Sequence, residues 1–261
     1  AEGMRGGAEA RQAGGAVAVV DGALAPALLA QLRQEVRGLV QRGELRSVGQ
    51  EASGRRDTMR WVDEGAARAW GCGALLRTIT LLKALAPVLQ RESECGAAGA
   101  RRLCPEGQLL EPRADVMVAR YGEGGFYQAH RDNACEEGVE DTPEARLAGL
   151  ERQAAALRRR GDHAGAVAVC ERMMLIRQKR AEFRPNRRWL TILLYLSEEA
   201  WNQSWGGQLR LFPRAPCEQK IAEARTDVPG ASHVDLDPKG GRLVCFQARD
   251  MLHEVRPAQR E

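Results

Sequence analysis

Short apolar runs alternate with glycine, proline or charged residues along much of the chain. One stretch, Asp115–Asn133, reads as a strand, a glycine-rich turn and a second extended piece. Similar apolar runs occupy Ala16–Val20, Thr58–Val62, Trp189–Leu196, Gly206–Pro213 and Gly241–Phe246. Short strands bounded in this way are typical of β-barrels. The pattern therefore predicts a mainly β protein in which these runs form the strands of a barrel.

Two segments in the first third of the chain have helical periodicity instead. Pro26–Gln41 carries an apolar stripe on one face, and Ala74–Gln90 repeats apolar residues in the same way until Pro87, which we expect to kink or end the helix. These supporting helices, at about residues 25–92, are predicted to pack along one face of the barrel. Gly43–Asp57 shows no periodicity, so we expect a mobile loop there.

A third helical region interrupts the strands at about residues 143–184. Its apolar positions repeat every three or four residues in two series, separated by Arg160–His163. The series are Leu147, Leu150, Ala154 and Leu157, then Ala166, Val169 or Cys170, Met173 and Ile176. The economical interpretation is an inserted helical hairpin whose two stripes face each other.

The net charge of +4 is distributed unevenly along the chain. Twelve Lys and Arg residues face five acids between Pro143 and Arg188, so the basic character belongs to the insertion. Three interpretations stay open for it: a solvated decoration, a docking arm for an acidic protein partner, or, less favoured, a nucleic-acid contact.

Length and cysteine content narrow the class of protein. A chain of 261 residues suits one barrel domain with flanking helices. Seven cysteines without a Cys-x-x-Cys pair indicate neither a disulfide framework nor a zinc module, which favours a reducing compartment, the cytoplasm or the nucleus. We expect no membrane span and see no signal peptide before Val17, although the chain opens at Ala1 and a removed leader stays possible.

The most informative chemistry is the triplet His130-Arg131-Asp132 together with the distant His253. In an extended segment residues i and i+2 point to the same side, so His130 and Asp132 can bind one ion together. Two imidazoles and one carboxylate can occupy one face of an octahedral Fe(II) ion and leave positions open for a cosubstrate and O2. The alternative is a polar strand pair with an unrelated buried histidine.

With these motifs, the chain resembles the 2-oxoglutarate and Fe(II)-dependent dioxygenases, and within them the prolyl hydroxylase domain branch of the prolyl 4-hydroxylases. The resemblance runs from about Val17 to the last residue around the insertion. It includes the metal residues, the strand before Tyr121, and the runs Arg188–Leu196, Gly206–Pro213 and His253–Pro257. It implies a double-stranded β-helix of the jelly-roll or cupin type.

The resemblance also implies how the cosubstrate is held. 2-Oxoglutarate would chelate the iron and bury its far carboxylate against Tyr195, in a pocket lined by Tyr121, Met117, Leu193, Leu209 and Thr191. The family places an arginine about nine residues beyond the distal histidine, which corresponds to position 262. Arg260 is two residues short of it, so we expect a final barrel strand after residue 261 to be missing from this chain.

For the substrate, the resemblance implies hydroxylation of prolyl residues in a protein or peptide, with ascorbate as a probable cofactor of the reaction. The matching positions are Arg55 and Asp57 on the loop before the second strand, and Arg188 and Tyr127 near the mouth of the site. Two rival functions stay open: a nucleic-acid demethylase of the AlkB type, and a binding module without catalysis if the natural chain ends at Glu261.

Overall fold

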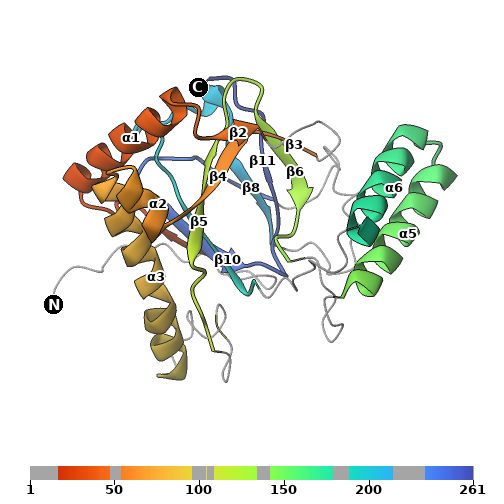
Figure 1. Ribbon diagram of the computed structural model, residues 1–261, viewed down its shortest axis with the longest axis horizontal. Helices are drawn as coiled ribbons and strands as arrows, with labels where there is room; N and C mark the ends of the chain where they lie inside the picture. The colour runs from red at the N-terminus through yellow and green to blue at the C-terminus, as the bar shows by residue number, and fades with distance from the viewer. Residues whose placement is uncertain are drawn as a thin grey trace.

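Three antiparallel sheets and five α-helices make up the computed structural model in the part of the chain that it describes. That part comprises residues 17–47, 54–95, 104, 109–133, 142–178, 188–213 and 233–260. One group of helices covers one side of the sheets, and a helical hairpin stands on the opposite side (Figure 1). The prediction of a mainly β protein with flanking helices is confirmed.

The largest sheet carries the residues that matter most for the site. Its five strands run in the order β3 (Arg55–Arg56), β6 (Phe126–His130), β11 (Leu252–Val255), β8 (Leu209–Phe212) and β9 (Val234–Leu236). Each neighbouring pair is antiparallel. Strands far apart in the sequence are therefore side by side, because β11 pairs with β6 on one side and with β8 on the other.

The other two sheets have three strands each. One has the order β1 (Val17–Val20), β10 (Leu243–Gln247) and β7 (Leu190–Leu194), and the other β2 (Arg46–Ser47), β4 (Thr58–Asp63) and β5 (Asp115–Arg120). Within the described residues, β7 and β5 are thus outer strands of two different sheets.

Two apolar clusters hold these layers together. One contains Leu32 and Leu39 of α1 (Pro26–Gln41), Leu75 and Ile79 of α3 (Gly73–Glu94), and Val62 of β4. The second lies between the sheets and is built from Leu209, Leu211, Val244, Phe246 and Met251. Both use strand alternation in the same way, since every second residue of a strand faces the cluster.

Two expectations for the N-terminal region need correction. The segment Gly43–Asp57 is not simply a loop, because it contains β2 and β3, which pair with β4 and β6. Backbone pairing needs no apolar periodicity, so two-residue strands leave no signal in the sequence. Pro87 does not end α3, which continues to Glu94. A proline removes one backbone donor but does not stop a helix that is held elsewhere.

The expectation that the chain does not span a membrane stays a prediction. α3 is long and apolar enough to cross a bilayer by length and composition, although the sequence was expected to contain no such segment. About 22% of its most apolar window is buried inside the protein. Its N-terminal half packs into the first apolar cluster through Ala74, Leu75 and Ile79.

The inserted helices are α5 (Pro143–Arg159) and α6 (His163–Gln178). Ala154 of α5 and Val169 and Met173 of α6 form the buried centre of the hairpin. Asp162 caps α6 because its Oδ1 accepts a hydrogen bond from the backbone N–H of Gly165 at 2.8 Å. Between the two helices Gly161 adopts a positive φ of 76° that allows the tight turn.

The N-terminus of α3 is capped by a side chain from another helix. Cys72 precedes α3 and makes no side-chain cap. Instead, Glu35 of α1 accepts hydrogen bonds from the backbone N–H groups of Ala74 at 2.9 Å and Leu75 at 2.8 Å. A carboxylate at this position satisfies two donors and interacts favourably with the helix dipole. Glu35 thereby ties α1 to α3.

We expect Glu35→Ala to lower the free energy of unfolding by about 2 kcal/mol, because two N–H groups lose their acceptor. Urea denaturation followed by circular dichroism measures this change. Glu92→Ala, which removes an exposed carboxylate from the other end of the same helix, is the matched control and should change stability by less than about 0.5 kcal/mol. Equal effects of the two substitutions would contradict the capping role.

Candidate metal centre

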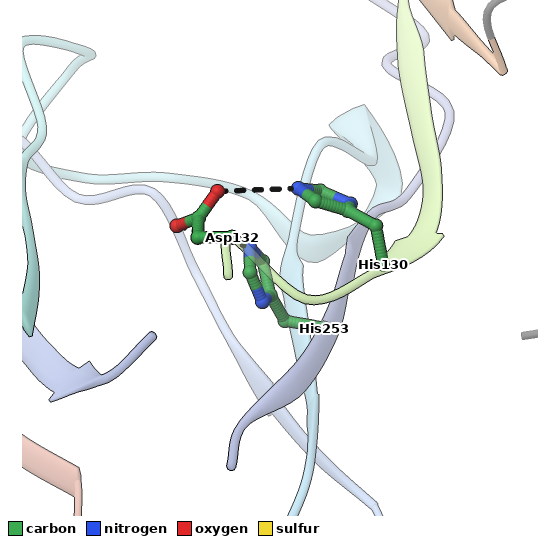
Figure 2. Close-up of side chains that lie close together, drawn as sticks. All are labelled: His130, Asp132 and His253. Carbon is green, nitrogen blue, oxygen red and sulfur yellow. Dashed lines mark ion pairs between the residues drawn. The ribbon is translucent and has the colours of Figure 1, made fainter. Parts of the chain in front are cut away.

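The pairing of β6 with β11 positions the two histidines of the site. His130 is the last residue of β6, and its Cα lies opposite that of His253 in the antiparallel register. Asp132 follows two residues after His130 and points to the same side (Figure 2). The three side chains converge from two strands, as the spacing in the sequence predicted.

The potential ligand atoms lie within 4.8 Å of one another. His130 Nε2 is 3.6 Å from Asp132 Oδ1, and His253 Nε2 is 3.8 Å from Asp132 Oδ2. Ligands about 2.1 Å from one ion and at right angles to each other are about 3 Å apart. Small side-chain movements of these three residues would therefore bring them onto a single ion.

Both imidazoles are held in the tautomer that a metal needs. His130 Nδ1 lies 2.8 Å from the carbonyl oxygen of Gln128, and His253 Nδ1 lies 3.0 Å from that of Met251. A carbonyl can only accept, so each Nδ1 donates its proton. Each Nε2 then presents a lone pair to the centre of the site.

The protonation states also suit a cation. Burial, helped by the nearby His130 ring, lowers the pKa of His253 to about 4, so this imidazole is neutral at neutral pH. Burial opposes the ionisation of Asp132, but the charge of the ion-paired Arg188 and the hydrogen bond from Thr191 favour the carboxylate. Together they hold the pKa of the Asp132 carboxyl below its usual range, and the carboxylate is ionised.

Comparison with protein families identifies the chain at this point. The family model of the 2OG-Fe(II) oxygenase superfamily matches residues 116–261, more than half of the chain. The chain belongs to this oxygenase superfamily. The matched region contains all three residues of the metal centre, and their donor set of two neutral imidazoles and one carboxylate fits Fe(II).

Solved structures agree on the fold. A prolyl-4-hydroxylase from Pseudomonas putida has a TM-score of 0.53 and 21% identity, with 94% of this chain and 86% of that chain covered. A prolyl hydroxylase from Trichoplax adhaerens, solved with a peptide fragment of the hypoxia inducible factor oxygen degradation domain, has a TM-score of 0.50 and 21% identity. The coverage there is 94% of this chain and 78% of that one. No curated protein gives a significant match.

Two further residues of the oxygenase bind the metal carboxylate. Thr191 Oγ1 donates a hydrogen bond to Asp132 Oδ2 at 2.5 Å, and Arg188 Nη1 forms an ion pair with Asp132 Oδ1 at 3.0 Å. The sequence had suggested the cosubstrate pocket for Thr191 and the substrate for Arg188. In the structure both contact the carboxylate, which strand parity alone does not reveal, and the roles in cosubstrate and substrate binding stay predictions.

Several residues proposed for the cosubstrate lie around the second apolar cluster. Leu193 and Tyr195 pack against it from β7 and the residues that follow, and Leu209 is one of its buried members. Burial raises the pKa of Tyr195 and that of Tyr121. Met117 differs, because it is on an outer strand and 38% exposed.

Three of the four residues proposed for the substrate are joined by contacts to one another. The Tyr127 ring centre lies 3.6 Å from that of His130, and the Arg55 guanidinium lies 4.4 Å from the Tyr127 ring centre. Arg55 in turn donates to both oxygens of the buried Asp57, at 2.7 and 2.6 Å. Arg55 of β3 is thereby linked to the metal ligand His130 through Tyr127.

Arg260 makes a cation–π contact near the end of the described residues. Its guanidinium lies over the Trp205 ring, 4.4 Å from the ring centre, in the short helix η3 (Gln203–Trp205). The preceding Gln259 donates its N–H to the carbonyl of Trp205 at 2.7 Å. This end of the chain is therefore anchored to η3, and Arg260 serves a packing contact there.

Sequence reasoning missed two residues of the centre. Phe246 packs against His253 with a ring separation of 4.8 Å. Asn133 is buried, donates its side-chain amide to the carbonyl of Arg188 at 2.9 Å, and donates its own N–H to the carbonyl of Ala248 at 3.0 Å. Its place directly after Asp132 was the only available signal. Asn133 ties the metal loop to the residues just before β7 and just after β10.

We expect Thr191→Val to weaken metal binding about tenfold, because the nearly isosteric side chain no longer orients Asp132. Isothermal titration calorimetry with Fe(II) under nitrogen measures this affinity. Thr78→Val is the matched control, since Thr78 is also buried but donates to Ala74 in α3. Unchanged affinity in Thr191→Val would show that its hydroxyl does not tune the centre.

Proposed function

We propose that this oxygenase hydroxylates prolyl residues in a protein or peptide, using Fe(II), 2-oxoglutarate and O2. The observation that carries the proposal is the convergence of His130, Asp132 and His253 on one point with both imidazoles fixed for metal binding. Superfamily membership supports the cofactors. The fold shared with prolyl hydroxylases, one of them solved with a peptide, supports the substrate class.

The iron and cosubstrate supply the oxidising chemistry: one oxygen atom of O2 enters a C–H bond of the substrate and the other enters succinate, with release of CO2. The protein supplies geometry and a site from which water is excluded. His130, His253 and Asp132 hold the ion, while Thr191 and Arg188 fix the direction of the carboxylate.

For the cosubstrate, we propose that the Tyr195 hydroxyl donates to the far carboxylate of 2-oxoglutarate. Leu193, Leu209, Tyr121 and Met117 would line the same pocket. Burial of Tyr195 supports this role, because a phenol with a raised pKa stays protonated and can donate. A buried carboxylate also requires a cation, and we assign that role to none of the described arginines.

We further propose that the fold is a double-stranded β-helix of the jelly-roll type and that the chain is one domain. The support is that strands of two antiparallel sheets, among them β8 and β10, share the second apolar cluster.

Near the mouth of the site we propose that Tyr127, Arg55 and Asp57 contact the substrate, together with Arg188. Their support is the set of contacts that links Arg55 of β3 to His130 through Tyr127. Ascorbate would keep the iron reduced between turnovers. A reducing compartment, the cytoplasm or the nucleus, remains our proposal for the location, on the cysteine pattern of the sequence.

The protein extended past residue 261, supplied with Fe(II), 2-oxoglutarate and ascorbate, should add one oxygen atom to proline-containing peptides of a library and release succinate in equal amount. Mass spectrometry detects the first product and an enzymatic assay the second. His253→Ala should reduce both at least about a thousandfold, because a ligand of the ion is lost. His233→Ala, which changes an exposed histidine of the same sheet region, is the control and should retain activity.

Other outcomes would redirect the assignment. Loss of methyl groups from methylated single-stranded DNA without any peptide oxidation would favour a nucleic-acid demethylase. Succinate release without either product would retain the oxygenase and reject both substrates. No turnover of 2-oxoglutarate in the extended protein would favour a binding module.

A further inference from the structure

The helix α6 has a second apolar face that the hairpin does not use. Its inner face packs against α5 through Ala166, Val169 and Met173. On the outer face, Val167, Met174 and Leu175 are 59%, 57% and 55% exposed. These three positions are spaced by seven and eight residues, so they align along one side of the helix. We call them the outer face of α6.

An exposed stripe of this kind is unusual on a short helix. A helix that is apolar on both sides normally packs against a neighbour on each. In the described part of the chain, however, α5 and α6 pack mainly on each other, and the hairpin stands apart from the barrel strands (Figure 1). Burying three such side chains stabilises a complex by several kcal/mol before the entropy of association is subtracted.

Two arginines border this stripe. The exposed Arg172 lies on one side of the outer face, one helical turn from Leu175. Arg158 of α5 reaches the other side, because its Nη2 lies 3.5 Å from Sγ of Cys170, which is one turn from Val167 and from Met174. Glu171 is the one acid on the outer face itself. A partner that covers the stripe therefore meets an arginine on each side, and we call this pair the arginine rim.

The apolar stripe and the charges beside it argue against two kinds of partner, a second copy of α6 and a nucleic acid. Symmetric pairing of two α6 helices would place the two-fold axis near the middle of the stripe and bring Glu171 close to Glu171 of the second copy, which like charges oppose. Nucleic acid would use the arginines but leave the apolar stripe without a partner. An acidic amphipathic helix matches both features.

We propose that the outer face of α6 is a docking site for an amphipathic helix of another protein, with an apolar stripe against Val167, Met174 and Leu175 and acidic residues toward the arginine rim. The hairpin supplies two helices and the partner the third, as in ordinary helix packing. This inference stands apart from the catalytic assignment, because the surface contains no residue of the metal centre.

The place of the hairpin in the chain gives such docking a consequence. The insertion lies between Asn133, next to the metal carboxylate, and Arg188, which pairs with that carboxylate. A partner held by the outer face of α6 is therefore tethered at the edge of the metal centre by both ends of the insertion. If the partner is a substrate, docking raises its local concentration there.

The test uses a fluorescent synthetic peptide of about 18 residues, about 27 Å as a helix, with leucines at helical spacing and glutamates on both flanks. Fluorescence anisotropy against the metal-free protein should give micromolar binding that weakens as salt increases. Met174→Glu and Leu175→Glu should each weaken binding at least about tenfold. Leu81→Glu, which changes an equally exposed leucine of α3, is the matched control and should bind normally.

A charge swap separates docking from a folding defect. Arg172→Glu should weaken binding of the glutamate-flanked peptide and improve binding of a lysine-flanked version, which a misfolded hairpin would not do. Equal binding of a scrambled peptide of the same composition would overturn the proposal. So would a dimer seen by light scattering that Met174→Glu dissociates, or binding to anionic phosphatidylserine vesicles that the same substitution abolishes.

Discussion

The antiparallel register between β6 and β11 is the constraint on which the rest of the molecule depends. It places His130 opposite His253, and a shift by one residue would turn one imidazole to the other face of the sheet. β8 on the far side and the apolar cluster beneath the sheet fix β11 in that register. The core therefore determines the geometry of the metal centre as well as the stability of the fold.

Polar contacts orient the third ligand, Asp132, which lies outside the paired strands β6 and β11. Thr191 contacts Asp132 from β7, and Arg188 contacts it from a position two residues before that strand. Asn133, next to Asp132, donates to the carbonyl of Arg188 and so joins the same two segments. The carboxylate lies beyond the end of β6, so strand pairing does not fix its direction. Its direction is consequently set by side chains that enter the chain some sixty residues later.

The sequence predicted the parts of the structure that repeat or that have fixed spacing. The long helices carry apolar stripes, and His130 and Asp132 share a face because they are two residues apart. Contacts between distant segments could not be predicted from the sequence. Nothing near Thr191 indicates that its hydroxyl contacts Asp132, and nothing near Glu35 indicates that it caps α3. Two-residue strands such as β3 were missed because pairing, and not side-chain pattern, defines them.

The fixed tautomers of the two histidines have a consequence for the choice of metal. With each Nδ1 proton held by the carbonyl two residues earlier in the chain, the Nε2 lone pairs are offered equally to any divalent ion of suitable size. First-row metals after iron, copper above all, generally bind such nitrogen and oxygen donors more tightly. The supply of metal ions in the cell therefore decides that iron is bound. Exposure of the protein to zinc or copper ions during purification would replace the iron.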